Sequence, residues 1–295
     1  GRLPITLVEE GHILMTSAIV GHTGFVGGNL VAAHHFDELF NSSNVATMRG
    51  RDYDLVVWSA AKAEKWRANQ DPEADARHIE ELEGLLSSFT AKRLVMISTV
   101  DVYGTPIEVT EDTPVQTEGL HAYGLNRFRL EEFARERFAQ AHVLRLPGLF
   151  GPGIKKNVIY DLLHDNNVDR IHADGVFQYY DLRHLWRDIE RVIALDIEVL
   201  NVATEPIATS EIAEQVFGMS FDNRPDGVAA GRYDMRSIHD GEWGGRDGYL
   251  YDRASVLADL ESFVRSERNA WRCRSTGRRP SAGAHPPRQS RKTSS

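Results

Sequence analysis

Short apolar runs alternate with longer amphipathic stretches along most of this chain. Buried strands are predicted at 17–20, 54–58, 93–97 and 142–146, with a further strand at 199–202. Apolar side chains at helical spacing predict helices over 24–35, 72–89 and 123–138. A last helix is predicted after its N-cap, Asp252. This alternation is typical of βαβ units and predicts an α/β fold with a parallel, doubly wound sheet.

The pattern divides the chain into four parts. The regular alternation predicts a first domain over 15–152, and the short helices and loops that follow predict a smaller lobe over 153–267. Residues 1–14 precede Met15 and the first strand, and we expect them to be a leader outside the fold. Residues 268–295 are rich in Arg, Ser, Pro and Gly without an apolar period, which predicts a basic, disordered tail.

Charge and composition exclude several classes of protein. The 295 residues are 41% hydrophobic and 26% charged, as in globular proteins. The net charge is −9, but residues 266–295 hold eight basic residues and one acid, so the remainder carries −16. An acidic body disfavours nucleic-acid binding. The tail is open to two interpretations, a solvated segment or an arm that touches nucleic acid or anionic lipid, and we favour the first.

The sequence also predicts the compartment and the absence of a metal. It has no apolar run long enough to cross a bilayer, and Glu9 and Glu10 interrupt any secretory signal. Its single cysteine, Cys273, excludes an internal disulfide or a cysteine zinc site, and its histidines show no metal-ligand spacing. We therefore expect a cytoplasmic protein without a metal, a nucleic-acid partner or a membrane partner.

A glycine-rich turn follows the first predicted strand and opens the first helix. The run Gly21-His-Thr23-Gly24-Phe25-Val26-Gly27 places glycines where the backbone turns tightly, approaches a pyrophosphate and packs against the strand. The N–H groups and positive dipole of the helix N-terminus then face the phosphates. The turn predicts dinucleotide binding.

The end of the next strand leaves the choice between NAD and NADP open. An acidic residue there favours NAD, but the region 39–44 ends in neutral polar residues. Asn41 and Ser42 are candidates to bind a ribose hydroxyl, whereas Arg49 and Arg51 are candidates to accept a 2′-phosphate.

Two further motifs place reactive side chains near the same sheet edge. Thr99 closes the third strong strand, and ligands of doubly wound sheets bind at strand carboxyl ends. Tyr123 and Arg127 begin a helix and share one face, because they are four residues apart. A hydroxyl, a phenol and a guanidinium are thus expected in one cleft.

Taken together, the motifs resemble the extended short-chain dehydrogenases/reductases, the NAD-dependent epimerase/dehydratase family. The resemblance spans about 15–265 and rests on the glycine turn, Ser59-Ala60-Ala61, Ser98-Thr99 with Val102-Tyr-Gly104, Tyr123, and Arg145-Leu-Pro147-Gly-Leu-Phe-Gly-Pro152. It implies a Rossmann-type domain with a substrate lobe and implies cofactor contacts from Ser59, Ala60, Ala61 and Pro147. It also implies that Tyr123 is the acid/base and that Thr99 holds the reacting oxygen.

The sequence departs from this family at two catalytic positions. The lysine that grips the nicotinamide ribose and lowers the tyrosine pKa is replaced by Arg127, which keeps the charge but not the shape. Arg127 therefore either takes the lysine role or marks a protein that binds a dinucleotide without full catalysis. Asp101 stands where related dehydratases carry a general base, yet Val100 replaces their second acid; Asp101 is either a base or a turn-capping residue.

The substrate side is expected after the fourth strand. Lys155, Lys156 and Asn157 are candidates to bind an anionic nucleotide-sugar, with a solvated basic turn as the alternative. Gln178 or Arg183 is a candidate for the nucleotide phosphate. The resemblance implies an NAD(P)-dependent enzyme acting on a nucleotide-sugar, or on a related hydroxyl or keto substrate, and a possible homodimer. The alternative is a non-catalytic NAD(P)-binding sensor.

Overall fold

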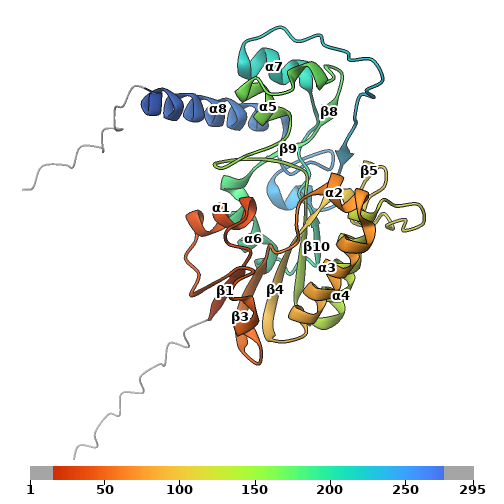
Figure 1. Cartoon of the computed structure of the whole chain (residues 1–295), viewed down its shortest axis with the longest axis vertical. Coiled ribbons are helices and arrows are strands. Elements are labelled where there is room, and N and C mark those ends of the chain that lie inside the picture. Colours follow the sequence, from red (N-terminus) through yellow and green to blue (C-terminus); the bar gives the residue numbers. More distant parts are fainter. Residues whose placement is uncertain (1–15, 276–295) are drawn as a thin grey trace, which may run out of the picture.

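A six-stranded parallel sheet forms the centre of the molecule (Figure 1). The structure is a computed structural model that describes residues 16–275, so the expected leader and the end of the tail lie outside the described residues. The strand order is β2-β1-β3-β4-β6-β10, and every neighbouring pair is parallel. The strands are β1 (Ser17–Val20), β2 (Glu38–Phe40), β3 (Asp52–Trp58), β4 (Thr90–Thr99), β6 (Ala141–Leu146) and β10 (Val199–Asn201). The predicted α/β class and parallel sheet are confirmed.

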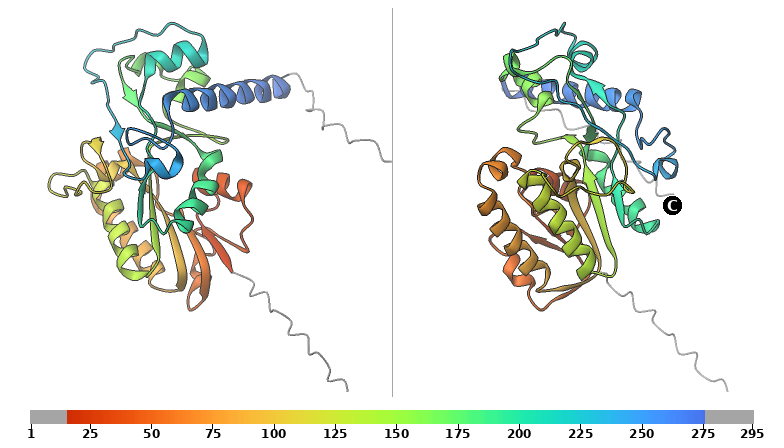
Figure 2. Two further views of the ribbon diagram at one scale, coloured as in Figure 1. Left: turned by 180° about the vertical axis from the view of Figure 1, so that it is seen from behind. Right: turned by 90° about the vertical axis from the view of Figure 1, so that its right-hand side faces the viewer.

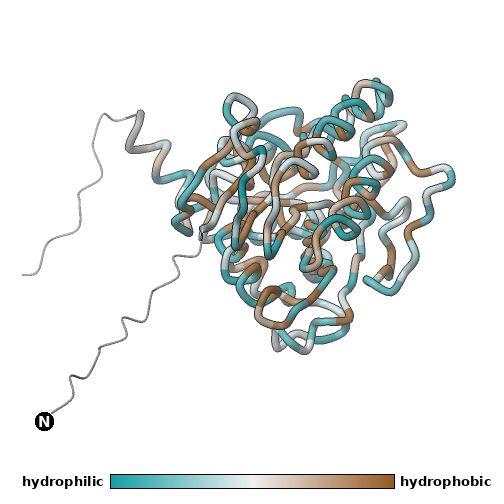
Figure 3. The backbone as a smooth tube through the Cα atoms, turned by 90° about the horizontal axis from the view of Figure 1, so that it is seen from below, coloured by the Kyte–Doolittle hydropathy of each residue, from teal (hydrophilic) through white to brown (hydrophobic). Residues whose placement is uncertain are grey.

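Helices cover both faces of this sheet. One face is covered by α3 (Pro72–Leu86) and α4 (Ala122–Arg137), with α2 (Lys65–Gln70) beside them, and the other by α1 (Phe25–Ala33) and α6 (Leu185–Ala194) (Figure 2). Two apolar cores follow from this layering, one around Trp58 and Ile79 and one around Val57 and Leu185. Figure 3 shows the hydrophobic strands running through the middle of the fold.

The remaining elements form the smaller lobe and its links to the sheet. The lobe core packs α5 (Val158–His164), α7 (Thr209–Phe217) and α8 (Arg253–Ser275) around Phe150 and Leu260. Short strand pairs join the segments: β5 (Ile107–Val109) with β12 (Asp234–Met235), β7 (Gly148–Phe150) with β9 (Tyr179–Asp181), and β8 (Val176–Phe177) with β11 (Ile207–Ala208). Short 3-10 helices are η1 (Val45–Met48), η2 (Val100–Val102), η3 (Val168–Arg170), η4 (Leu182–His184) and η5 (Asp240–Trp243).

Two boundaries differ from the sequence-based expectation. The lobe is not one continuous stretch after residue 152, because α6 and β10 return to cover and extend the central sheet. The helix α8 runs to Ser275, past Arg268, where we expected the tail to begin. Its apolar residues Leu260 and Phe263 are buried in the lobe core, so tertiary packing supports a helix whose later turns lack an apolar period. Within the described residues, no helix is long and apolar enough to cross a membrane.

Local sequence signals fix where two important helices begin. Pro72 occupies the first turn of α3, and the Asp71 side chain accepts a hydrogen bond from the Ala74 N–H at 3.0 Å. At the start of α4, Nδ1 of His121 accepts from the Gly124 N–H at 3.0 Å. This cap places Tyr123 in the first turn of α4, at the carboxyl edge of the sheet.

The strand order determines where a ligand can bind. The chain leaves β1 toward β2 on one side and returns to β3 on the other, so the order reverses between β1 and β3. Ligands of doubly wound sheets bind at such a switch point, outside the strand carboxyl ends. The glycine turn follows β1 and therefore lies at this position.

Candidate active site

The glycine turn has the geometry of a phosphate-binding loop. Gly21 has φ of +91°, and a Cβ there would lie 2.2 Å from the Ser59 carbonyl oxygen. A Cβ on Gly27 would lie 2.2 Å from the Gly21 carbonyl oxygen. Gly24 is the N-cap of α1, no side chain caps this helix, and its first turn holds no acid. The turn needs glycine at 21 and 27 and leaves a positive helix end without a protein anion.

The end of β2 lies against this turn. The Gly21 N–H donates to the Phe40 carbonyl at 2.8 Å, and Nδ2 of Asn41 lies 3.3 Å from Nε2 of His22. Asn41 therefore borders the glycine turn, with Ser42 next to it in the chain, and the predicted binding of a ribose hydroxyl by these residues stays a prediction. Arg51 does not border the turn, because it precedes β3 and so lies at the amino ends of the strands. It also pairs with Glu38, which makes it a poor candidate to bind a 2′-phosphate.

Thr99 lies at the carboxyl end of β4 and belongs to a polar cluster. Its Oγ1 accepts from the Asp101 N–H at 3.2 Å and lies 3.5 Å from Asp101 Oδ2. The other oxygen of Asp101 accepts from Lys65 Nζ at 2.7 Å and from Tyr233 Oη at 3.0 Å. Asp101 is thus both part of the η2 turn and the centre of a charged group that joins α2 to the lobe.

Tyr123 enters the same region from α4. A Cβ on Gly124 would lie 2.1 Å from the Asp101 carbonyl oxygen, so the start of α4 packs directly on η2. The Tyr123 side chain is buried, and this burial raises the pKa of its phenol. The nearby charges divide: Arg127 and Lys65 lower this pKa, whereas Asp101 and Asp75 raise it. The structure therefore brings Thr99, Asp101 and Tyr123 together.

Arg127 lies beside Tyr123, but its guanidinium is engaged elsewhere. Its Cζ is 4.1 Å from the centroid of the Tyr123 ring, over the ring face. Its nitrogens pair with the Asp75 carboxylate on α3 and donate to the Lys62 carbonyl at 2.6 Å. Both partners of the ion pair are buried. The predicted shared face is present, but these bonds direct the guanidinium into the protein rather than toward a bound ribose.

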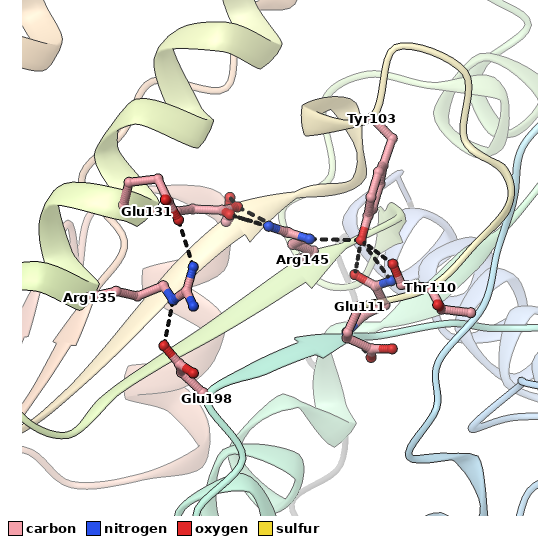
Figure 4. A network of polar contacts seen from close by, with 10 residues as sticks. Tyr103, Thr110, Glu111, Glu131, Arg135, Arg145 and Glu198 are labelled. Carbon is pink, nitrogen blue, oxygen red and sulfur yellow. Dashed lines mark hydrogen bonds and ion pairs between the residues drawn. The ribbon is translucent and has the colours of Figure 1, made fainter. Parts of the chain in front are cut away.

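A buried ion network fixes α4 against the sheet (Figure 4). Arg145 on β6 donates to Glu131 on α4 at 2.6 Å and to Tyr103 Oη at 2.7 Å. Glu131 also accepts from Ser98, the residue before Thr99. The Tyr103 hydroxyl donates in turn to the Thr110 carbonyl at 2.8 Å. These bonds set the position of the helix that carries Tyr123 relative to the strand that carries Thr99.

The predicted cofactor contacts at the other strand ends also lie along this edge. Ser59, Ala60 and Ala61 follow β3, and the Ser59 N–H donates to the Val20 carbonyl at 2.9 Å. Pro147 follows β6 directly. The predicted contacts of these residues with the cofactor stay predictions.

The substrate candidates separate into two groups. Lys155 and Lys156 are exposed, and Lys156 Nζ donates to the Ala63 carbonyl in the loop after β3, so it reaches that loop from the lobe side. Asn157 instead caps α5 through the Ile159 and Tyr160 N–H groups and donates to the Leu149 carbonyl. Its side chain holds the loop together.

Gln178 is a correction to the sequence-based expectation. Its side chain is 1% exposed, its amide nitrogen donates to the Thr204 carbonyl, and its oxygen accepts from the Met235 N–H at 2.7 Å. A group engaged at both ends by buried backbone does not contact a substrate. Arg183, the other candidate, pairs with Asp181.

Two features elsewhere do not belong to this site. A cavity of about 660 Å³ lies beside α6 and the segment 243–255, with Arg187 and Trp243 in its walls, and no residue of the glycine turn lines it. Asp181, His184 and Asp259 bring ligand-type atoms within 4.8 Å of one another. Their carboxylates already accept from Arg183 and His184, so they form an ion-pair cluster.

Sequence reasoning missed Lys65 and Tyr233. Lys65 opens α2, which the hydrophobic pattern did not predict, and Tyr233 lies 132 residues beyond Asp101. The sequence offered one signal for Lys65, namely a lysine six residues after Ser59, which follows the strand β3 at the switch point. Tyr233 offered none, because the contact depends on how the lobe folds back.

No sequence-family profile and no curated protein matches this chain. Several solved structures do match it in three dimensions. A UDP-glucose 4-epimerase from Thermotoga maritima, crystallised with UDP-glucose, aligns at TM-score 0.65 and 15% identity, over 87% of this chain and 100% of its own. A dTDP-4-dehydrorhamnose reductase from Bacillus anthracis, in complex with NADP, aligns at 0.65 and 17%, over 85% and 99%. The protein MoeE5, in complex with UDP-glucuronic acid and NAD, aligns at 0.67 and 15%, over 86% and 99%.

These similarities establish the fold of this chain. It is the doubly wound fold with a C-terminal lobe that sugar-nucleotide reductases and epimerases share, and it extends over nearly the whole length of those proteins. The expectation of a Rossmann-type, doubly wound fold is thereby confirmed.

Proposed function

We propose that this protein binds NAD or NADP at the carboxyl edge of its sheet and transfers a hydride at a hydroxyl or keto carbon of a nucleotide-sugar. One observation carries the proposal: the glycine turn, Thr99 and Tyr123 converge at the switch point between β1 and the strands beside it. The reductase, the epimerase and MoeE5 with the same fold support it, since two of them are complexed with NADP or NAD and two with UDP-sugars.

The residues present fit a dinucleotide. Any Cβ at Gly21 or Gly27 would collide with the backbone of Ser59 or Gly21, so only glycines allow this tight turn, and the α1 N-terminus offers its N–H groups to a pyrophosphate. Asn41 and Ser42 border the turn where an adenosine ribose would lie. Two arginines are candidates to bind the 2′-phosphate of NADP, and one of them, Arg51, is engaged by Glu38. Because Arg49 is left as a candidate, both NAD and NADP stay possible cofactors.

The chemistry follows from the side chains at the edge. A bound nicotinamide supplies the hydride acceptor or donor. Tyr123 takes or gives the proton of the substrate hydroxyl, and Thr99 orients that oxygen through its own hydroxyl. Asp101 holds the Thr99 hydroxyl in place and, with Lys65, sets the charge around it. Burial of Tyr123 keeps water away from the proton that it moves.

The substrate is proposed to be anionic. Lys155 and Lys156 lie exposed on the lobe side, and Lys156 reaches the loop after β3, so an anionic substrate bound there would meet positive charge. The sequence resemblance further predicts a homodimer, which size-exclusion chromatography with light scattering would test.

The first experiment is to denature the purified protein and identify released nucleotide by mass spectrometry. Tightly held NAD points to a reaction that regenerates its cofactor in each cycle, as in an epimerase or dehydratase. An empty site that NADPH stabilises in thermal unfolding points to a reductase. An empty site that responds to neither dinucleotide refutes the proposal.

Two variants then separate binding from catalysis. Gly27→Val drives a side chain into the backbone of the turn and is expected to abolish dinucleotide binding, whereas Gly84→Val, at a helical glycine with no atom within 4 Å of its Cβ, tests the general cost of a glycine replacement. Tyr123→Phe is expected to bind the dinucleotide normally and lose turnover by about 10²-fold or more. Full turnover in Tyr123→Phe would remove the catalytic assignment and leave a dinucleotide-binding protein.

A further inference from the structure

Two cations lie around Tyr123: Arg127 lies against its ring, and Lys65 is on α2, the helix whose Asn69 accepts from the Tyr123 N–H at 3.0 Å. The guanidinium of Arg127 lies over the ring face and is held by Asp75 and by the Lys62 carbonyl, within a buried ion pair. Its donors are therefore used within the protein, although its charge is the strongest nearby one that lowers the pKa of the Tyr123 phenol. The second cation is Lys65.

The ammonium of Lys65 lies on the open side of the site. It is 2.7 Å from Asp101 Oδ1 and 3.4 Å from Tyr233 Oη, and its side chain is 40% exposed. An ammonium has three donors, and these contacts use two of them. Asp101 Oδ2 lies 3.5 Å from the Thr99 hydroxyl, so a polar chain runs from Lys65 to the residue proposed to orient the substrate oxygen.

We propose that Lys65 is a positioning residue that sets the acidity of Tyr123, with Asp101 and Tyr233 holding its ammonium at the cleft. This inference rests on the proposed function, in which Tyr123 moves a proton. Five groups face the phenol: Arg127, Asp75, Asp101, Lys65 and the His121 ring, whose centroid is 6.5 Å from that of Tyr123. Arg127 and Asp75 form one compensated pair, and Lys65 and Asp101 form the other.

The geometry predicts what happens when one member of the second pair is removed. Without Lys65, the Asp101 carboxylate beside the start of α4 is left uncompensated, and a nearby negative charge disfavours the tyrosinate. Lys65 also supports its own charge here, since contact with Asp101 raises the pKa of Lys65 despite burial. We expect the loss of one charge from this partly exposed cluster to move the Tyr123 midpoint by about one pH unit.

Four variants test this inference. Lys65→Met removes the charge, Lys65→Arg keeps it, and Lys65→Met with Asp101→Asn removes both charges. The fourth is Lys92→Met, a matched control that breaks a similar lysine–aspartate pair with Asp54 at the amino edge of the sheet. Each full-length protein is labelled with tyrosine carrying ¹³C at Cζ, and the Tyr123 resonance is assigned by its loss in Tyr123→Phe. Its titration is followed by NMR with saturating NAD.

The expected result is an upward shift of the Tyr123 midpoint by about one pH unit in Lys65→Met. Lys65→Arg, Lys92→Met and the double variant should titrate within about 0.3 unit of the wild type. A wild-type midpoint in Lys65→Met overturns the inference, and so does an equal shift in Lys65→Met and Lys65→Arg, which would indicate a structural effect. Failure of both NAD and NADP to bind the wild type counts against the proposed function instead, and the same titration without a dinucleotide still decides the role of Lys65.

Discussion

The ion pair between Arg145 and Glu131 makes a sharp stability prediction. The two side chains are 4% and 1% exposed, so neither charge is solvated in the folded protein. Arg145→Met leaves the Glu131 carboxylate buried with the Ser98 hydroxyl and no cation, and it removes a donor from Tyr103 Oη. Breaking such a buried pair from one side costs roughly 3–5 kcal/mol of unfolding free energy. Glu131→Leu, which strands Arg145 instead, should cost a similar amount.

The double variant distinguishes this reasoning from simple loss of packing. Arg145→Met combined with Glu131→Leu removes both charges and leaves only the Ser98 and Tyr103 hydroxyls short of a partner. Each lost hydrogen bond costs about 1 kcal/mol, so we expect the double variant to lie within about 2 kcal/mol of the wild type. The two single effects are therefore expected to be strongly non-additive.

Figure 4 also supplies the control. Arg135 pairs with Glu198 and Glu132 at 2.6 Å, but its side chain is 31% exposed, so Arg135→Met should cost less than about 1 kcal/mol. Urea unfolding followed by far-UV circular dichroism measures all four variants. A double variant that loses the sum of the single effects would refute the argument that an uncompensated buried charge dominates the cost.

Two further predictions concern the start of α4 and the response to acid. Gly124→Ala places a Cβ 2.1 Å from the Asp101 carbonyl oxygen; we expect it to cost about 1–3 kcal/mol and to lower turnover, while Gly84→Ala, in an open helical position, stays neutral or stabilises. Unfolding midpoints and steady-state rates check both. Burial lowers the pKa of His34, His78 and His121 below 6.5, so the unfolded chain takes up protons first and stability falls as the pH drops below about 6.5. Urea midpoints at pH 7.5 and 5.5 measure this, and a His78→Leu variant with an undiminished fall would contradict it.

Much of the framework could be read from the sequence because the signals are local. Each strand of the sheet except β2 is an apolar run, and the glycine turn combines a backbone requirement with a position after β1. These features depend on neighbours within a few residues. The return of β10 to the sheet is not of this kind, since its pairing with β6 joins residues more than 50 positions apart, and the pattern after residue 153 does not encode it.

Arg127 shows most clearly which side-chain roles could not be predicted from the sequence. Helical spacing correctly places it beside Tyr123, but its direction is set by Asp75, which is 52 residues away on another helix. The same reasoning applies to Gln178, whose two backbone partners lie 26 and 57 residues further along the chain. A sequence lists the charges and donors of a site, whereas the pairing among them decides which remain available to a ligand. Here that pairing engages the side chains of Arg127 and Gln178 within the protein and leaves Lys65 partly exposed beside Asp101, where we propose that it acts on Tyr123.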